Sequence, residues 1–205
     1  MNPRVLSTKK FYEKHGRKSW TERKTNSFYY EKEFTKLASL WPAKSKILDI
    51  GCAAGIHVPL FLGIGRHVKY EGTDISKQFL KDAQRRYPQL PFFEEDIATG
   101  GNIKSNQYGG FWAANVLMHI PFELWDAMFA NLERIVKAGR YGFLTLPTAH
   151  PNPEDTTDTR HFTFLPADKQ KKYLKERGWK IIKSGSTDGF TQKDIWRWYI
   201  VQLPK

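Results

Sequence analysis

The 205-residue sequence predicts an α/β fold in which helices cover both faces of a doubly wound, mostly parallel sheet. Short apolar runs typical of buried strands alternate with segments of helical period, and most connections between them are short. The first apolar run, Lys46–Gly51, breaks into a glycine turn that closes at Gly55. A strand, a glycine turn and a helix in this order bring backbone N–H groups and a helix N-terminus close to a bound ligand.

The N-terminal half supplies the first strands of this sheet. The expected elements are a helix from Asn26 or Ser27 to Leu40, a strand at Lys46–Gly51, a helix at Ile56–Gly63, a strand at Val68–Thr73, a helix at Lys77–Tyr87 and a short strand at Phe92-Phe93. Trp41-Pro42 ends the first helix, because the residue before a proline disfavours the helical conformation. Ser76 is a typical N-cap for the helix that Pro88 stops.

The C-terminal half continues the alternation. The expected elements are a loop at Gly100–Gln107, a strand at Gly110–Val116, a helix at Pro121–Lys137, a turn at Gly139, a strand at Tyr141–Leu146, a helix at Pro166–Arg177 and strands at Trp179–Ser184 and Trp196–Leu203. Gly178 is a natural C-cap. One connection is long: Pro147–Thr163 follows a strand at the carboxyl edge of the sheet, where ligands bind and long ordered loops are usually lids.

Composition indicates a single cytoplasmic domain. The chain has one cysteine, Cys52, which excludes an internal disulfide and is typical of a reducing compartment. No apolar run reaches the length of a membrane span, so we expect no membrane association. The net charge of +12 divides into +8 for residues 1–46, −2 for 47–165 and +6 for 166–205. The basic ends are either solvated helix faces or an electrostatic footprint for nucleic acid.

Four motifs in order resemble the class I S-adenosylmethionine-dependent methyltransferases. The glycine-turn motif is Asp49-Ile50-Gly51-Cys52-Ala53-Ala54-Gly55, with Ala53 where the family has its middle glycine. Asp74 matches the acid after strand two, Asp96 the acid after strand three, and Phe111–Pro121 the strand-four segment. The resemblance runs from Lys46 to Leu146. It implies a Rossmann-like methyltransferase fold with seven strands, the last of them antiparallel.

The resemblance also implies a cofactor, S-adenosylmethionine, and a product, S-adenosylhomocysteine. The expected cofactor contacts are Asp49, Gly51, Cys52, Ala53, Gly55, Asp74, Ile75, Asp96, Ile97 and Asn115. In this interpretation Asp49 supports the turn or reaches the ammonium through water, Asp74 holds the ribose, and Asp96 accepts from the adenine amine. Ile75 and Ile97 would sandwich the adenine, and Asn115 lies near the methionine tail. A strand-end N-cap for Asp74 and a plain turn acid for Asp96 are the alternatives.

Residues for the methyl acceptor are less clearly marked. His119 is the candidate general base, because an imidazole can take a proton from a hydroxyl or amine; a histidine packed beside the sheet is the alternative. Arg160 and His161 are candidates for contact with an anionic acceptor, and Tyr29 and His57 are weaker ones. The six histidines have no metal-ligand spacing, so we expect no metal.

These observations favour methyl transfer to an oxygen or nitrogen of a small molecule. The expected division of the single domain is a basic helical cover at 1–45 with Tyr12 and Trp20 over the cofactor, a cofactor core at 46–146, a substrate loop at 147–165, and a C-terminal helix and strands at 166–205.

The first alternative is a nucleic-acid methyltransferase, for which the lysines of the two basic ends should share one face. Against it, Asn115 is not followed by the two prolines that are typical of base N-methylation. The second is a catalytically silent cofactor-binding module. The sequence leaves the oligomeric state open.

Overall fold

The computed structural model describes residues 1–20, 30–150, 157–187 and 195–205, with the backbone alone for 15–20 and 66. Its centre is a seven-stranded sheet in the order β3-β2-β1-β4-β5-β7-β6. The strands are β1 Lys46–Ile50, β2 Lys69–Asp74, β3 Phe92–Glu94, β4 Tyr108–Ala113, β5 Val136–Pro147, β6 Lys180–Thr187 and β7 Trp196–Gln202. β1 to β5 pair in parallel, and β7 is antiparallel to both β5 and β6. The expected fold, including the antiparallel last strand, is confirmed.

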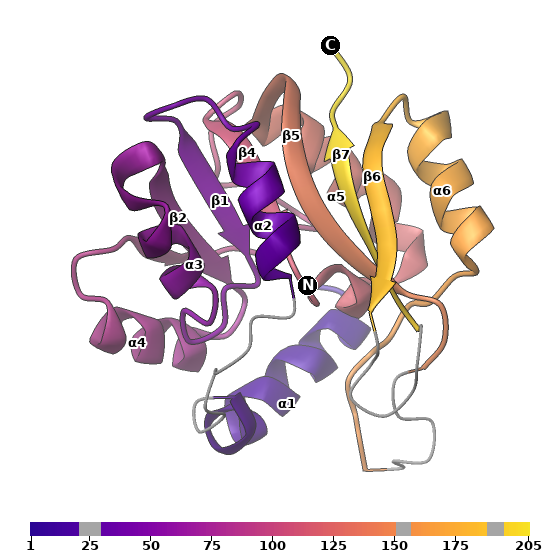
Figure 1. Cartoon of the computed structure of the whole chain (residues 1–205). Coiled ribbons are helices and arrows are strands. Elements are labelled where there is room, and N and C mark those ends of the chain that lie inside the picture. Colours follow the sequence, from indigo (N-terminus) through magenta and orange to yellow (C-terminus); the bar gives the residue numbers. More distant parts are fainter. Residues whose placement is uncertain (21–29, 151–156, 188–194) are drawn as a thin grey trace.

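Helices cover both faces of the sheet (Figure 1). They are α1 Pro3–Trp20, α2 Glu31–Ala38, α3 Val58–Gly63, α4 Lys77–Arg86, α5 Trp125–Ile135 and α6 Ala167–Glu176. α2 and α3 pack on one face and α5 and α6 on the other, while α4 contacts β2 and β3. α1 lies beyond the carboxyl ends of the central strands (Figure 1). Within the described ranges, no helix has both the length and the apolar character that a bilayer span requires.

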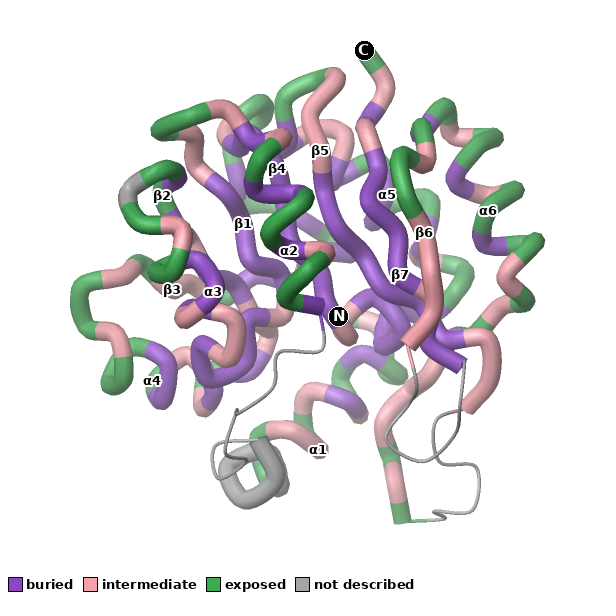
Figure 2. The backbone as a smooth tube through the Cα atoms, in the orientation of Figure 1, coloured by how far each residue is buried: buried purple, intermediate pink, exposed green. Residues whose placement is uncertain are grey.

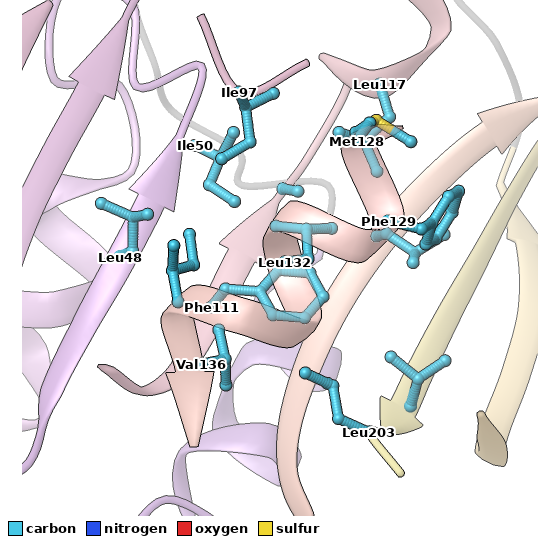
Figure 3. Packing of buried hydrophobic residues seen from close by; sticks show 14 of the residues in the cluster. Leu48, Ile50, Ile97, Phe111, Leu117, Met128, Phe129, Leu132, Val136 and Leu203 are labelled. Atoms are coloured by element: carbon cyan, nitrogen blue, oxygen red, sulfur yellow. The ribbon is translucent and has the colours of Figure 1, made fainter. Parts of the chain in front are cut away.

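Two apolar cores hold the layers together. On the α5 face, Phe111 of β4 packs with Leu132 and Phe129, and Leu48 of β1 belongs to the same cluster (Figure 3). The face covered by α2 and α3 is rich in aromatic rings, with Trp112 stacked on Phe143 at 4.1 Å between ring centroids. β4 is buried along its whole length, as the apolar run predicted for a strand covered on both faces (Figure 2). Each fully buried large side chain contributes about 1.5–3 kcal/mol.

The C-terminal part of the sheet differs from the sequence prediction in its boundaries. The helix expected at Pro121–Lys137 is α5, which begins at Trp125 after a 3-10 turn and ends at Ile135. Val136 then starts β5 directly, because it pairs with Tyr108 of β4 across an irregular register. Gly139, predicted as a turn before the strand, lies inside β5 with φ 71°. Pairing with β4 therefore extends β5 through Gly139, although a glycine usually marks the end of a strand.

Other predicted elements also have different boundaries, among them the strand expected at Trp179–Ser184, which is β6, Lys180–Thr187. Strand four ends at Ala113 rather than Val116, so Asn115 (φ 56°) belongs to the turn that follows. The helix expected to begin at Ile56 begins at Val58. The helix expected from residue 26 is described only as α2, Glu31–Ala38, since 21–29 lie outside the described residues. The N-cap Ser76 is confirmed, because its hydroxyl accepts from Phe79 N.

Candidate functional site

The glycine turn after β1 has a backbone that few side chains tolerate. Gly51, Ala53 and Gly55 have φ values of 67°, 48° and 76°. A Cβ on Gly51 would overlap the side chain of Val116, which follows β4. Cys52 N donates to Thr73 O at 3.0 Å and so fastens the turn to β2. The turn thus lies at the carboxyl edge of the sheet, where the sequence predicts the cofactor.

Asp74, at the end of β2, is joined to this turn by its side chain. Its Oδ2 accepts from Ala53 N at 3.0 Å, and its Oδ1 accepts from Ser76 N at 2.9 Å. Burial raises the pKa of Asp74 to about 6. The N-cap of α4 is Ser76, so Asp74 is not needed for that role. A carboxylate has about four lone-pair positions, and these two bonds leave room for further hydroxyl donors.

Asp96 and Ile97 follow β3 in a tight turn. Asp96 Oδ1 accepts from Ala98 N at 3.0 Å, so its side chain already closes the turn, as the plain turn-acid alternative predicts. Ile97 is buried against α5, and Asn131 Nδ2 donates to its carbonyl at 2.9 Å. Ile75, beside Asp74, is half-buried. The structure therefore places Asp96 and Ile75 at the carboxyl edge, and Ile97 mainly in the core.

Asn115 is held in its left-handed turn by Thr145 of β5. Its backbone N donates to Thr145 Oγ1 at 2.7 Å, and its Oδ1 accepts from the same hydroxyl at 3.0 Å. The hydroxyl of Tyr30 also donates to Asn115 Oδ1, at 3.3 Å. Tyr29, the residue predicted for substrate, lies outside the described residues. Its neighbour Tyr30 is buried at this edge, and sequence reasoning did not single it out.

His119, which follows β4, is buried against α1 and against the segment around His161. Its Nδ1 lies 2.8 Å from the His161 carbonyl oxygen, which can only accept, so Nδ1 carries the proton. Its Nε2 therefore presents a lone pair, and the Tyr12 hydroxyl of α1 donates to it at 2.7 Å. Burial lowers the pKa of His119 to about 3 and keeps the ring neutral. A pKa this low opposes uptake of a proton, so the arrangement is that of a neutral, oriented hydrogen-bond acceptor.

Arg160 lies over Tyr12 but its charge is already paired. Its guanidinium binds both carboxylate oxygens of Asp158 and donates from Nη1 to the Tyr12 hydroxyl at 3.0 Å. It also lies over the rings of Phe11 and Phe162, 5.0 and 4.9 Å from their centroids. Asp158 was missed in the sequence, although an acid two residues before an arginine is a recognisable partner. Arg160 thus joins the segment after β5 to α1.

Further hydrogen bonds join the same two segments. His161 N donates to Thr8 Oγ1 at 2.8 Å, and Ser7 Oγ donates to the Thr159 carbonyl at 2.8 Å. The His161 ring lies 2.9 Å from Thr163 Oγ1. The predicted residues Arg160, His161 and His119 are therefore brought together, and Tyr12 of α1 bonds to both His119 and Arg160. The side chain of Trp20, the second predicted cover residue, is not described.

The two basic helices lie at different borders of the sheet. α6, with Lys169, Lys171, Lys172 and Lys175, flanks the β6 edge of the sheet, while α1 lies beyond the carboxyl ends of the central strands (Figure 1). Lys9 of α1 forms an ion pair with Glu94 at 2.7 Å. Among the described residues, no group of three or more histidine, cysteine, aspartate or glutamate side chains could hold a metal ion.

Comparison with known proteins agrees with this geometry. A family model described as "Methyltransferase domain" matches residues 47–139. No curated protein matches the sequence. The magnesium protoporphyrin IX methyltransferase of Synechocystis PCC 6803, crystallised with S-adenosylhomocysteine, has a TM-score of 0.73 at 17% identity over 98% of this chain and 99% of that chain.

Two archaeal structures are also similar. A putative methyltransferase of Haloferax volcanii, in complex with the Trm112 methyltransferase activator, has a TM-score of 0.70 at 11% identity over 100% of this chain and 99% of that one. A SAM-dependent methyltransferase of Archaeoglobus fulgidus has a TM-score of 0.65 at 14% identity over 84% and 92%. At such identities the structures show the fold, and the family model shows the domain. Residues 47–139 thus match a methyltransferase domain, and the chain as a whole has the fold of S-adenosylmethionine-dependent methyltransferases.

Proposed function

We propose that the protein transfers the methyl group of S-adenosylmethionine to an oxygen or nitrogen of a small-molecule acceptor, with His119 as general base. One observation carries the proposal: the Nε2 lone pair of a buried, neutral His119 accepts from a hydroxyl at 2.7 Å. An acceptor hydroxyl or amine that replaced the Tyr12 hydroxyl would donate to the same lone pair. Positioned proton transfer of this kind contributes about 10²–10⁴-fold to rate.

The closure of the site supports a small acceptor. α1 and residues 157–165 are joined across His119 by the bonds from Ser7, His161 and Arg160. An acceptor held beneath this cover would be largely enclosed, which excludes water from the reacting atoms. We propose that α1 belongs to the expected cover, 1–45, and 157–165 to the expected substrate loop, 147–165. The Synechocystis neighbour is named for a small-molecule substrate, which agrees with this proposal.

The cofactor fits the residues at the carboxyl edge. S-adenosylmethionine supplies the reactive methyl group when bound, and the chain's residues bind, orient and exclude water. We propose that Asp74 accepts from the ribose hydroxyls. The rest of the cofactor site would be lined by the Gly51–Gly55 backbone, Ile75, Asp96 and Asn115. Asp49 provides an independent sign of fit, because among the described residues its buried Oδ1 has no hydrogen-bond partner.

For Arg160 and His161 we propose a role other than contact with an anionic acceptor. Since Asp158 already neutralises Arg160, we propose that Arg160 positions Tyr12 over the site and that His161 fixes the His119 tautomer through its carbonyl. An acceptor with a strong negative charge is therefore not required. The single cysteine remains the reason to expect a reducing cytoplasm.

Transfer of labelled methyl from S-adenosylmethionine into a cell extract tests the proposal. The extract is separated into small-molecule, nucleic-acid and protein fractions, and a His119→Gln variant is run in parallel. We expect label in the small-molecule fraction, reduced in the variant. Label in nucleic acid would instead favour the alternative acceptor, and cofactor binding without any transfer would favour the silent module.

A further inference from the structure

Two buried polar atoms beside the glycine turn face each other without a hydrogen bond. Asp49 Oδ1 and His57 Nδ1 lie 3.7 Å apart, and neither has a hydrogen-bond partner among the described residues. The Asp49 side chain is fully buried and that of His57 is 15% exposed. A buried polar atom left unpaired costs about 1–3 kcal/mol, so two neighbouring ones indicate a group that binds between them.

The surroundings hold both side chains in place. Tyr70 donates its hydroxyl to Asp49 Oδ2 at 3.0 Å, which leaves Oδ1 as the unused oxygen. The His57 ring packs edge-on against Trp112, with centroids 5.6 Å apart. Asp49 comes two residues before the Gly51–Gly55 turn and His57 two residues after it, so the pair flanks the turn that faces the cofactor.

The geometry selects a particular kind of ligand. At 3.7 Å the two atoms are too far apart for a direct hydrogen bond. A single group with at least two N–H donors could reach both, since it would lie about 2.8–3.0 Å from each. The carboxylate oxygen is an acceptor, and Nδ1 is an acceptor in the tautomer that carries its proton on Nε2. An ammonium, which offers three donors and a compensating charge, could bind both atoms.

We propose that His57 is a specificity-determining residue for the cofactor, and that its Nδ1 and Asp49 Oδ1 together bind the ammonium of the cofactor's methionine part. The inference goes beyond a water-mediated role for Asp49 alone. It assigns a ligand contact to a histidine that the glycine-turn motif does not include. It rests on S-adenosylmethionine as cofactor and does not depend on which acceptor is methylated.

Calorimetry with a matched pair of ligands tests the assignment on the full chain. The ligands are S-adenosylhomocysteine and its desamino analogue, in which hydrogen replaces the amino group and the carboxylate is kept. His57→Phe should weaken S-adenosylhomocysteine binding about tenfold or more, the loss expected for one hydrogen bond to a charged group. Binding of the desamino analogue should be unchanged, because it has no ammonium to lose.

Two further variants guard against a folding artefact. His57→Ala gives a second truncation if the phenylalanine does not fit. His67→Phe is the matched control, since His67 is bonded through Nε2 to the Trp41 carbonyl and should affect neither ligand. An equal loss for both ligands would assign His57 a purely structural role and overturn the proposal. Unchanged binding of S-adenosylhomocysteine in both His57 variants would overturn it as well.

Discussion

The hydroxyl of Tyr12 donates to Nε2 of His119 across 107 positions of sequence, at 2.7 Å. This bond joins the first helix of the chain to the segment that leaves β4, and it uses the lone pair that we assign to proton transfer. Tyr12 also packs against Phe79 of α4, which belongs to an apolar cluster with Ala53 of the glycine turn. One aromatic side chain therefore contacts the proposed base and the apolar cluster that includes part of the turn expected to bind the cofactor.

Replacing His119 should separate chemistry from cofactor binding. His119→Gln removes the imidazole lone pair, so we expect methyl transfer to fall about 10²–10⁴-fold while the affinity for S-adenosylmethionine stays within twofold, roughly the error of such measurements. Initial rates and calorimetry check the two quantities. His67→Gln is the control, with normal rates expected. A normal rate in His119→Gln would leave His119 as a packed histidine.

Two substitutions of Tyr12 should distinguish its hydroxyl from its ring. Tyr12→Phe keeps the contact with Phe79 but removes the bonds to His119 and Arg160, so it should alter transfer more than cofactor dissociation. Tyr12→Ala also removes the ring and should speed cofactor dissociation, because the cover loses buried apolar area. Stopped-flow dissociation measures the difference. Identical dissociation rates in the two variants would contradict a covering role for the ring.

Cofactor affinity should depend on the ionisation of Asp74. Burial raises its pKa to about 6, and hydroxyl donors from a ribose favour the charged form, so binding should lower that pKa. Affinity should therefore be constant above pH 7 and fall as pH decreases through 6, with proton release on binding below that pH. Calorimetry in buffers of different ionisation enthalpy measures both.

The Asp74→Asn variant provides the comparison for this pH dependence. It should bind S-adenosylmethionine about 1–3 kcal/mol more weakly at pH 8, because an acceptor for buried donors is lost. Its affinity should also lose the dependence on pH between 5 and 7. A variant that kept the wild-type profile would show that another group titrates.

Gly51 should not tolerate a side chain. Gly51→Ala puts a Cβ at φ 67° and against Val116, so we expect a loss of stability of about 1–3 kcal/mol and impaired cofactor binding. Gly63→Ala, at the end of α3, is the control, since its Cβ would meet no heavy atom within 4 Å in the described structure. Chemical denaturation measures both. Equal stabilities would mean that the turn relaxes around the new methyl group.

Local signals in the sequence predict the strands, the helices and the glycine turn, because periodicity, capping and φ preferences act over a few residues. Ser76 before α4 and Gly178 after α6 were predictable for that reason. Tertiary structure decided what depends on distant contacts. Val136 became a strand residue because it pairs with Tyr108, and Arg160 became part of the cover because Asp158 and Tyr12 bind it. The hydrogen bond from Tyr12 to His119 and the approach of His57 Nδ1 to Asp49 Oδ1 across the turn required the folded chain, since no local pattern records which side chains the sheet edge brings together.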